Sequence, residues 1–368
     1  MTKYQIPSQN LKPVNDLLRK EIDLQIKEVL DRQCFILGPK LEEFESSFAA
    51  TCKTNHCIGV GNGTDAITMS LVAGDVKPND EVILPSFTHI ATAHAVTTVG
   101  AIPVFVDIQK DSFNIDPVAV QNAITEKTKA IVAVNLFGHP CDYDKLPVAE
   151  SDNLLLIEDN AQAQGAKYKQ RICGGIGRIN ATSFYPTKNI GAMGDGGAIT
   201  TNSSKVARFL RDYRSLGTRK QTISSIYGRN SRLDELQAAI LLVKLKYLKR
   251  FNEERANIAK QYTKKLSNIS KLKTPTTLPG TVPVWHQYTV QTECRDELMI
   301  HLQQNGIGSA MYYPVPCHLQ LPYVGSRFQS LPNSEYAAKT VLSLPCYPGL
   351  TEDEIDYICS VITSYFEN

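Results

Sequence analysis

The sequence has no excess of charge of one sign. Lysine and arginine total 39 and aspartate and glutamate total 37, so the 368 residues carry a net charge of +2. Without concentrated basic charge, binding of nucleic acid or of an anionic membrane has no electrostatic support. The apolar runs stop well short of the length needed to cross a bilayer, and residues 1–8 show no signal-peptide pattern. We therefore predict a cytoplasmic protein with neither a nucleic-acid nor a membrane partner.

Paired cysteines are also missing. The nine cysteines are odd in number and scattered, and no two of them have the Cys-x-x-Cys spacing of a zinc site. Reduced thiols that pack as small apolar residues are the expected state. The sequence therefore predicts no metal site and no disulfide framework.

What the sequence does contain is an alternation of short apolar stretches and helical patterns between about residues 55 and 250. This alternation is typical of βαβ units and of a sheet covered by helices on both faces. The length and the 42% hydrophobic content are sufficient for a large core and two structural domains. The candidate strands are 57–60, 81–84, 103–106, 130–134 and 154–157.

Helices are expected between these strands and after them. One begins at Thr64 and ends near Gly74, and another spans about 90–100. A long helical stretch covers about 234–266, and because it exceeds the usual helix length we expect a bend or break near Asn252.

The sequence after this long stretch predicts a smaller α+β unit. Residues 287–291 form its strand candidate, and a capping box of Thr351 and Glu354 opens its last helix. The fold class is therefore α/β, with a large domain over 1–250 and a small domain over 251–368. The helices expected in the small domain are near 295–304, 334–342 and 351–365.

Acidic residues close one of the buried strands. Glu158 and Asp159 follow the apolar strand 154–157 and are followed in turn by Gln162. Open α/β sheets bind their ligands at the carboxyl ends of their strands. From its position alone, Asp159 could bind a metal, act as a general base, or pair with the protonated nitrogen of a cofactor ring.

Two further segments, together with the acidic strand end at Asp159, make a set of three candidate site segments. Lys188, in the segment 183–188, stands between a short strand and a stretch rich in glycine. Gly63 and Thr64 lie between a strand and a helix, where backbone N–H groups can receive a phosphate. A phosphate anchor, a partner for a ring nitrogen and a lysine amine are the parts of a pyridoxal phosphate site.

The order of these segments resembles the DegT/DnrJ/EryC/StrS family of nucleotide-sugar aminotransferases. In that family strand-Glu-Asp-x-x-Gln precedes Ser-Phe-x-x-x-Lys-x-x-Gly-x-x-Gly-Asp-Gly-Gly, as it does here at 158–162 and 183–197. The resemblance implies an aspartate aminotransferase fold, with a mostly parallel mixed sheet, and a homodimer with active sites at the subunit interface. Further matching segments are 36–39, 44–45, 103–107, 228–232, 313–318, 344–345 and 348–351.

The resemblance also implies a role for each site residue. Lys188 would be the Schiff-base lysine and Asp159 the partner of the ring nitrogen, and both would be catalytic. Gln162 would lie beside the ring hydroxyl, and His89 would stack on the ring or serve in ordinary packing. The phosphate would be bound by Ser183, Gly63 and Thr64.

Four more residues are candidates with open alternatives. Asn230 would reach the phosphate of the partner subunit, with a helix cap as the competing interpretation. Arg219, Lys220 and His318 are candidate contacts for the nucleotide diphosphate, although solvated side chains or a core histidine would explain them equally.

The implied reaction moves an amino group from an amino acid, usually glutamate in the family, through pyridoxamine phosphate to a keto sugar. The sequences of segments 61–66 and 284–288 look most like those of enzymes that act at C3 of dTDP-linked 3-keto-6-deoxyhexoses. The alternative within the family is a C4 aminotransferase for a dTDP- or UDP-linked 4-keto sugar, and a dehydratase would carry histidine in place of Lys188.

Two alternatives lie outside aminotransferase chemistry. A nicotinamide-dependent oxidoreductase is disfavoured because Gly59, Gly61 and Gly63 do not have the Gly-x-Gly-x-x-Gly spacing. A binding or regulatory protein would tolerate loss of Lys188 or Asp159, and the sequence retains both.

Overall fold

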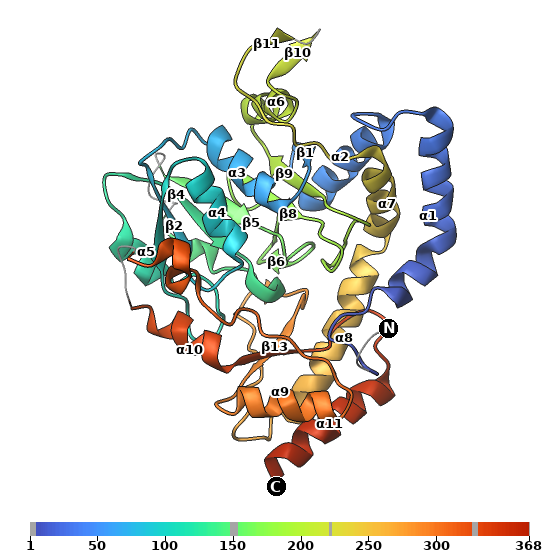
Figure 1. Cartoon of the computed structure of the whole chain (residues 1–368), viewed down its shortest axis with the longest axis vertical. Coiled ribbons are helices and arrows are strands. Elements are labelled where there is room, and N and C mark those ends of the chain that lie inside the picture. Colours follow the sequence, from blue (N-terminus) through green and yellow to red (C-terminus); the bar gives the residue numbers. More distant parts are fainter. Residues whose placement is uncertain (1–4, 148–153, 221–222, 326–329, 368) are drawn as a thin grey trace.

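The computed structural model describes residues 5–147, 154–220, 223–325 and 330–367 (Figure 1). These residues form a seven-stranded sheet in the order β1-β9-β8-β5-β4-β2-β3. Neighbouring strands from β3 to β8 are parallel, and β9 is antiparallel to both of its neighbours. The predicted mostly parallel mixed sheet is thus confirmed. Its strands are β1 His56–Val60, β2 Glu81–Pro85, β3 Ile102–Val106, β4 Thr128–Val134, β5 Leu155–Asp159, β8 Ile179–Ser183 and β9 Gly197–Thr201.

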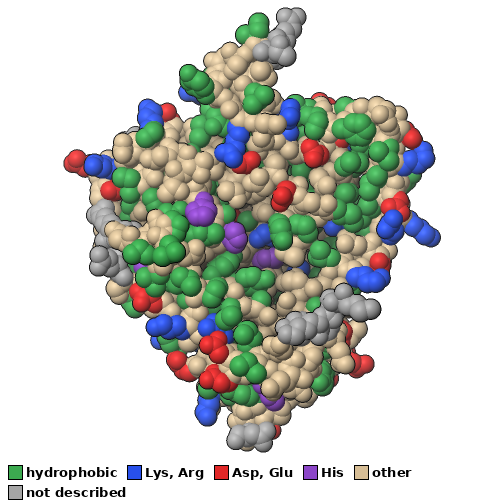
Figure 2. Space-filling model, in the orientation of Figure 1, with side chains coloured by type: hydrophobic (Ala, Val, Ile, Leu, Met, Phe, Trp, Pro, Cys, Tyr) green, Lys and Arg blue, Asp and Glu red, His purple; other side chains and the backbone are tan. Residues whose placement is uncertain are grey.

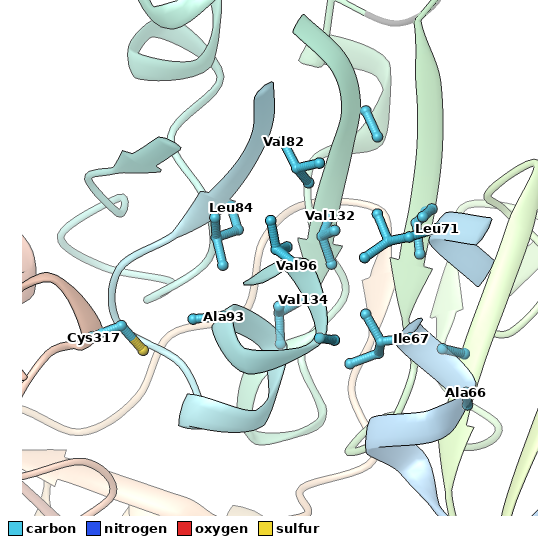
Figure 3. Close-up of a cluster of buried hydrophobic side chains, with 14 of the residues drawn as sticks. Ala66, Ile67, Leu71, Val82, Leu84, Ala93, Val96, Val132, Val134 and Cys317 are labelled. Carbon is cyan, nitrogen blue, oxygen red and sulfur yellow. The ribbon is translucent and has the colours of Figure 1, made fainter. Parts of the chain in front are cut away.

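Alternate residues of the central strands face opposite sides of the sheet. Val82, Leu84 and Val132 belong to a cluster with helices α3 and α4, whereas Ile83 and Ile131 belong to a cluster on the other side. This two-residue period is the geometry of an extended strand, and apolar residues at every position bury both faces. Figure 3 shows the first cluster, to which α3 contributes Ile67 and Leu71.

Helices cover the sheet and connect it to the C-terminal region. The long stretch predicted at 234–266 is divided at Tyr247, not near Asn252, so that α8 continues from α7 toward the lower part of the molecule (Figure 1). The helices up to this point are α1 Lys12–Arg32, α2 Pro39–Cys52, α3 Gly63–Ala73, α4 Ile90–Thr98, α5 Pro117–Ala123, α6 Ser204–Tyr213, α7 Glu235–Lys246 and α8 Leu248–Leu266.

A separate hydrophobic cluster lies in the C-terminal region. Its largest fully buried side chains are Tyr262 of α8 and Tyr288 of β13. The predicted helix at 334–342 ends at Thr340, because Val341 already has an extended backbone and begins β14. The elements of this region are β12 Thr281–Val282, β13 Tyr288–Gln291, α9 Arg295–Gln304, α10 Pro332–Thr340, β14 Val341–Leu344 and α11 Glu352–Glu367.

The division of the chain at residue 250 stays a prediction. Cys317 and Val341 pack in the cluster of the large sheet, and Ile6 packs in the C-terminal cluster. The predicted capping box is confirmed, since the N–H of Thr351 donates to Glu354 at 2.8 Å and the N–H of Glu354 to Thr351 Oγ1 at 3.2 Å.

The remaining short strands form small sheets apart from the seven-stranded one. β6 Lys167–Tyr168 lies between β7 Arg171–Ile172 and β12, and the hairpin of β10 Thr218–Lys220 and β11 Ile223–Ser224 projects from the top of Figure 1. All nine cysteines are unpaired, as predicted. Within the described residues, no group of side chains is suited to hold a metal ion, and no helix has the length and apolar character that crossing a membrane requires.

Candidate active site

The carboxyl ends of β1, β2, β5 and β8 meet at one edge of the sheet and border a cavity. Its volume is about 500 Å³, and residues from all four strand ends line it. Parallel strands place their carboxyl ends together, so segments far apart in the sequence converge here. The cavity brings together seven predicted site residues: Gly63, Thr64, His89, Asp159, Gln162, Ser183 and Lys188.

Lys188 lies in a tight turn after β8. Its N–H donates to the carbonyl of Tyr185 at 2.9 Å. Gly191 approaches Pro186 so closely that a Cβ on Gly191 would lie 2.2 Å from the Pro186 carbonyl oxygen, which explains the glycine. Burial lowers the pKa of Lys188 to about 8, and the negative charge of Asp159 opposes this shift. About a tenth of this amine is therefore neutral at pH 7, far more than for a lysine of ordinary pKa, and only the neutral form acts as a nucleophile or base.

This pKa predicts how Lys188 reacts with an amine reagent. In cofactor-free protein, the rate of acetylation of Lys188 should rise about tenfold per pH unit below pH 8 and level off above it, because only the neutral amine reacts. Competitive labelling with peptide mass spectrometry measures this rate for each lysine. A rate still rising between pH 9 and 10, as for an exposed lysine, would contradict the assigned environment.

Asp159 ends β5 and is 4% exposed. Its Oδ1 accepts the N–H of Ala161 at 3.0 Å, and its Oδ2 accepts the hydroxyl of Thr92 at 3.2 Å. Burial raises the pKa of Asp159, whereas the two hydrogen bonds and the charge of Lys188 favour the carboxylate. A cationic ring nitrogen placed beside this carboxylate would stabilise its charged form further.

An anion cradle lies at the N-terminus of α3. Asn62 caps this helix by accepting the N–H of Asp65 at 2.8 Å, and Gly63 and Thr64 form its first turn, where backbone N–H groups have no intrahelical acceptor. A Cβ on Gly63 would lie 2.6 Å from Ser183 Cβ. The glycine therefore lets helix and strand end approach closely enough to share one phosphate.

Substituting this glycine tests the cradle. Gly63→Ala should weaken phosphate-dependent binding of pyridoxal phosphate at least about tenfold, because the methyl group must displace Ser183. Equilibrium titration followed by absorbance gives the affinity. Equal affinities of wild type and Gly63→Ala would remove Gly63 from the cradle.

Gln162 and His89 both line the cavity. Gln162 Oε1 accepts the N–H of Phe137 at 2.6 Å, and its Nε2 donates to the hydroxyl of Tyr313 at 3.0 Å. The ring of Tyr313 meets the ring of His89 edge-on, 5.7 Å between centroids. His89 also caps α4 by accepting the N–H of Ala91 at 3.2 Å. Burial and the charge of Lys188 lower the pKa of His89, which favours a neutral ring.

The remaining candidates lie elsewhere. Asn230 is exposed opposite Ser215, outside the residues that line this cavity, and the N-cap position of α7 is Asp234 and not Asn230. Arg219 and Lys220 belong to β10, but their side chains lie outside the described part of the structure.

His318 occupies a structural position. It is 2% exposed, its Nδ1 lies 2.5 Å from the hydroxyl of Ser86, and its Nε2 lies 3.5 Å from Glu335. This position agrees with the alternative of a core histidine and does not support a contact with the nucleotide.

Among the residues of the cavity without a role predicted from the sequence are Thr92, Tyr313 and His286. Thr92 lies one helical turn after His89, so the start of α4 at this strand end was the signal for it. Tyr313 and His286 stand inside segments already matched to the family, but no local pattern places them beside Lys188.

A lysine of lowered pKa, a buried aspartate and a helix-terminal phosphate cradle at one edge of a mostly parallel sheet fit pyridoxal phosphate. This combination defines an aminotransferase-type α/β protein. The chain belongs to the DegT/DnrJ/EryC1/StrS aminotransferase family, whose model matches residues 16–363.

Curated relatives extend over nearly the whole chain. A "dTDP-3-amino-3,4,6-trideoxy-alpha-D-glucose transaminase" of Streptomyces venezuelae is 42% identical over 98% of this chain and 96% of its own length. A "Pleiotropic regulatory protein" of Geobacillus stearothermophilus is 42% identical over 99% of both chains. A "UDP-N-acetyl-3-dehydro-alpha-D-glucosamine 3-aminotranferase" of Acidithiobacillus ferrooxidans is 39% identical over 97% of both.

Solved structures agree with this assignment. The chain superposes on S. venezuelae DesV in complex with a ketimine intermediate with a TM-score of 0.96, at 42% identity and 99% coverage of both chains. It also superposes on NtdA of Bacillus subtilis with bound pyridoxamine phosphate (TM-score 0.88, 32% identity), over 95% of this chain and 82% of that one. The protein is thus a pyridoxal phosphate-dependent aminotransferase with the predicted fold.

Proposed function

We propose that the protein transfers an amino group from an amino acid, with glutamate as the expected donor, to C3 of a dTDP-linked 3-keto-6-deoxyhexose. The observation that carries the proposal is the pairing of Lys188 with Asp159 in one buried cavity. The names of two relatives, which specify a 3-amino and a 3-dehydro sugar, support C3 as the site of transfer.

Each residue of the cavity has a task in this reaction. The bound cofactor supplies an electron sink for the bond broken at Cα of the amino donor. The neutral amine of Lys188 takes up the Cα proton and later delivers a proton to the sugar carbon, which is the action of a general base and acid. Asp159 holds a proton on the ring nitrogen by its charge. Gln162 donates toward the ring hydroxyl, and Gly63, Thr64 and Ser183 hold the phosphate.

The active unit in this proposal is a homodimer with sites at the subunit interface. The outer face of α1 exposes Leu17 and Leu24 at 52% and 58%. Figure 2 shows hydrophobic side chains gathered at the upper right, where Figure 1 places α1, α2 and α7. An exposed apolar surface of this kind is typical of a face that a partner subunit covers. Asn230, exposed outside its own cavity, would then reach the phosphate bound by the partner. Light scattering coupled to size-exclusion chromatography tests the dimer.

The alternatives differ in what they need from the site. A C4 aminotransferase, or one for a UDP-linked sugar, would use the same Lys188 and Asp159. A dehydratase would lack Lys188, and family membership leaves the nicotinamide oxidoreductase without support. A purely regulatory protein, which the name of one relative brings to mind, would have no need of the lowered pKa of Lys188.

A substrate panel separates these alternatives. Purified protein with pyridoxal phosphate and glutamate is incubated with dTDP-linked 3-keto and 4-keto sugars and their UDP counterparts, and the products are identified by mass spectrometry and NMR. We expect a 3-amino product from the dTDP-linked 3-keto-6-deoxyhexose. Amination at C4 alone would overturn the regiochemistry, and absence of any amino sugar would overturn the proposed function.

A further inference from the structure

Asn189, the residue after Lys188, has its amide fixed in one orientation. Its Nδ2 donates to the carbonyl of Val284 at 3.0 Å and to Asn252 Oδ1 at 2.8 Å. A carbonyl oxygen only accepts, so the NH₂ group must face Val284. Asn252 is fixed in the same way, because its own Nδ2 donates to the carbonyl of Gln164 at 2.9 Å. The Oδ1 of Asn189 therefore points away from Val284, where it can accept a hydrogen bond from another donor.

That acceptor determines the tautomer of His286. His286 Nδ1 lies 3.1 Å from Asn189 Oδ1. Since Oδ1 cannot donate, Nδ1 must carry the hydrogen. In a neutral imidazole the other nitrogen, Nε2, then has a lone pair and can only accept.

The surroundings of His286 keep the ring neutral. The side chain is 4% exposed, and burial together with the positive charges of Lys188 and Arg255 lowers the pKa of His286 well below its ordinary value. Asp159 and Asp195 are the carboxylates that line the same cavity. The hydrogen-bond partner of Nδ1 is an uncharged amide, not a carboxylate that would favour the imidazolium.

The backbone of His286 is held in place from two sides. The N–H groups of Val284 and Gln287 donate to the carbonyls of Gly138 at 3.0 Å and Phe137 at 3.2 Å. A Cβ on Gly138 would lie 2.8 Å from the backbone nitrogen of His286, so only glycine permits this approach. From α8, Arg255 donates to the carbonyl of His286 at 3.3 Å. The ring is therefore presented rigidly to the cavity, which both His286 and Lys188 line.

We infer that His286 is a positioning residue for the reaction, and that its Nε2 accepts a hydrogen bond from the amine of Lys188. The inference rests on the proposed function. A neutral amine with one N–H committed to Nε2 turns its lone pair in a defined direction, and orientation of this kind is a large part of catalytic efficiency. Asn189 holds the ring of His286 through its side chain and follows Lys188 directly in the main chain. The ring that orients the amine is therefore linked to the backbone beside Lys188.

Two substitutions separate the roles of the two ring nitrogens. His286→Asn retains a donor for Asn189 near the position of Nδ1 but has no acceptor at the position of Nε2. His286→Gln places an amide oxygen near the position of Nε2. We expect His286→Asn to lower the pKa of Lys188 by about one unit, because an acceptor stabilises the ammonium form. The same variant should lose about tenfold in kcat with KM little changed, whereas His286→Gln should stay within about threefold of wild type.

The readouts do not all depend on catalysis. In cofactor-free protein, ¹⁵N NMR of labelled histidine, with His286→Gln for assignment, reports the tautomer, and pH-dependent acetylation reports the pKa of Lys188. A proton on Nε2, an imidazolium at neutral pH, or an unchanged pKa of Lys188 in folded His286→Asn would overturn the inference. If wild type produced no amino sugar while these two measurements came out as expected, the proposed function would fail and the interaction of His286 with Lys188 would stand.

Discussion

Lys188→Ala should lose transamination by at least about 10⁴-fold in kcat, the largest effect expected of any single substitution. One amine serves as covalent attachment point and as the group that moves the proton, so its removal eliminates both functions. Steady-state formation of the amino sugar measures the loss. Single-turnover conversion with glutamate shows whether the first half of the reaction fails alone.

Lys244 provides a matched control. It is also buried, and burial lowers its pKa to about 8, but its Nζ donates to the carbonyl of Gly191 at 2.7 Å and it borders a small cavity of about 30 Å³. Lys244→Met should therefore keep activity within about tenfold, through an effect on the turn that follows Lys188. A Lys188→Ala variant with near wild-type activity, or a Lys244→Met variant as inactive as Lys188→Ala should be, would contradict the assignment.

Asp159→Asn should lower kcat by about 10²- to 10³-fold while leaving the fold intact. Asparagine has the same shape, its Oδ1 can still accept the N–H of Ala161, and the Thr92 hydroxyl can reverse to accept from the new amide. Only the negative charge is lost, and with it the preference for a protonated ring nitrogen. Kinetics together with the pH dependence of the absorption of the bound cofactor measure both consequences.

Thr92→Val is the graded counterpart of this substitution. It removes one hydrogen bond to the carboxylate and keeps the charge, so a loss of about tenfold is expected. If Asp159→Asn were no more impaired than Thr92→Val, the charge of Asp159 would not be what the ring nitrogen requires.

The sheet and the residues of the cavity were predictable because local and global signals agree. Strands such as 130–134 are apolar on both faces, as the buried strands of a parallel sheet are. The parallel strands β5 and β8 bring Asp159 and Ser183 to one edge, and β1, which joins the sheet through the antiparallel β9, brings Gly63 to the same edge. The order of the three segments then identified the family before any contact was known.

The features that the sequence did not predict depend on contacts between distant residues. No glycine or proline marks the division of the long helix at Tyr247, whose hydroxyl donates to Glu21 of α1 and whose ring stacks on Phe251. The burial of His318 depends on Ser86, more than two hundred residues away. The N-terminal helices α1 and α2 were not predicted either, because their buried positions are defined by packing on α7.

The most direct test of the role of Lys188 is to identify the residue to which pyridoxal phosphate is attached. Protein incubated with pyridoxal phosphate is reduced with borohydride and digested, and the modified peptide is identified by mass spectrometry. We expect a single major label on Lys188, in the segment that follows β8. A label on Lys244, which has a similarly lowered pKa but lies outside the lining of the large cavity, or no label at all, would contradict it.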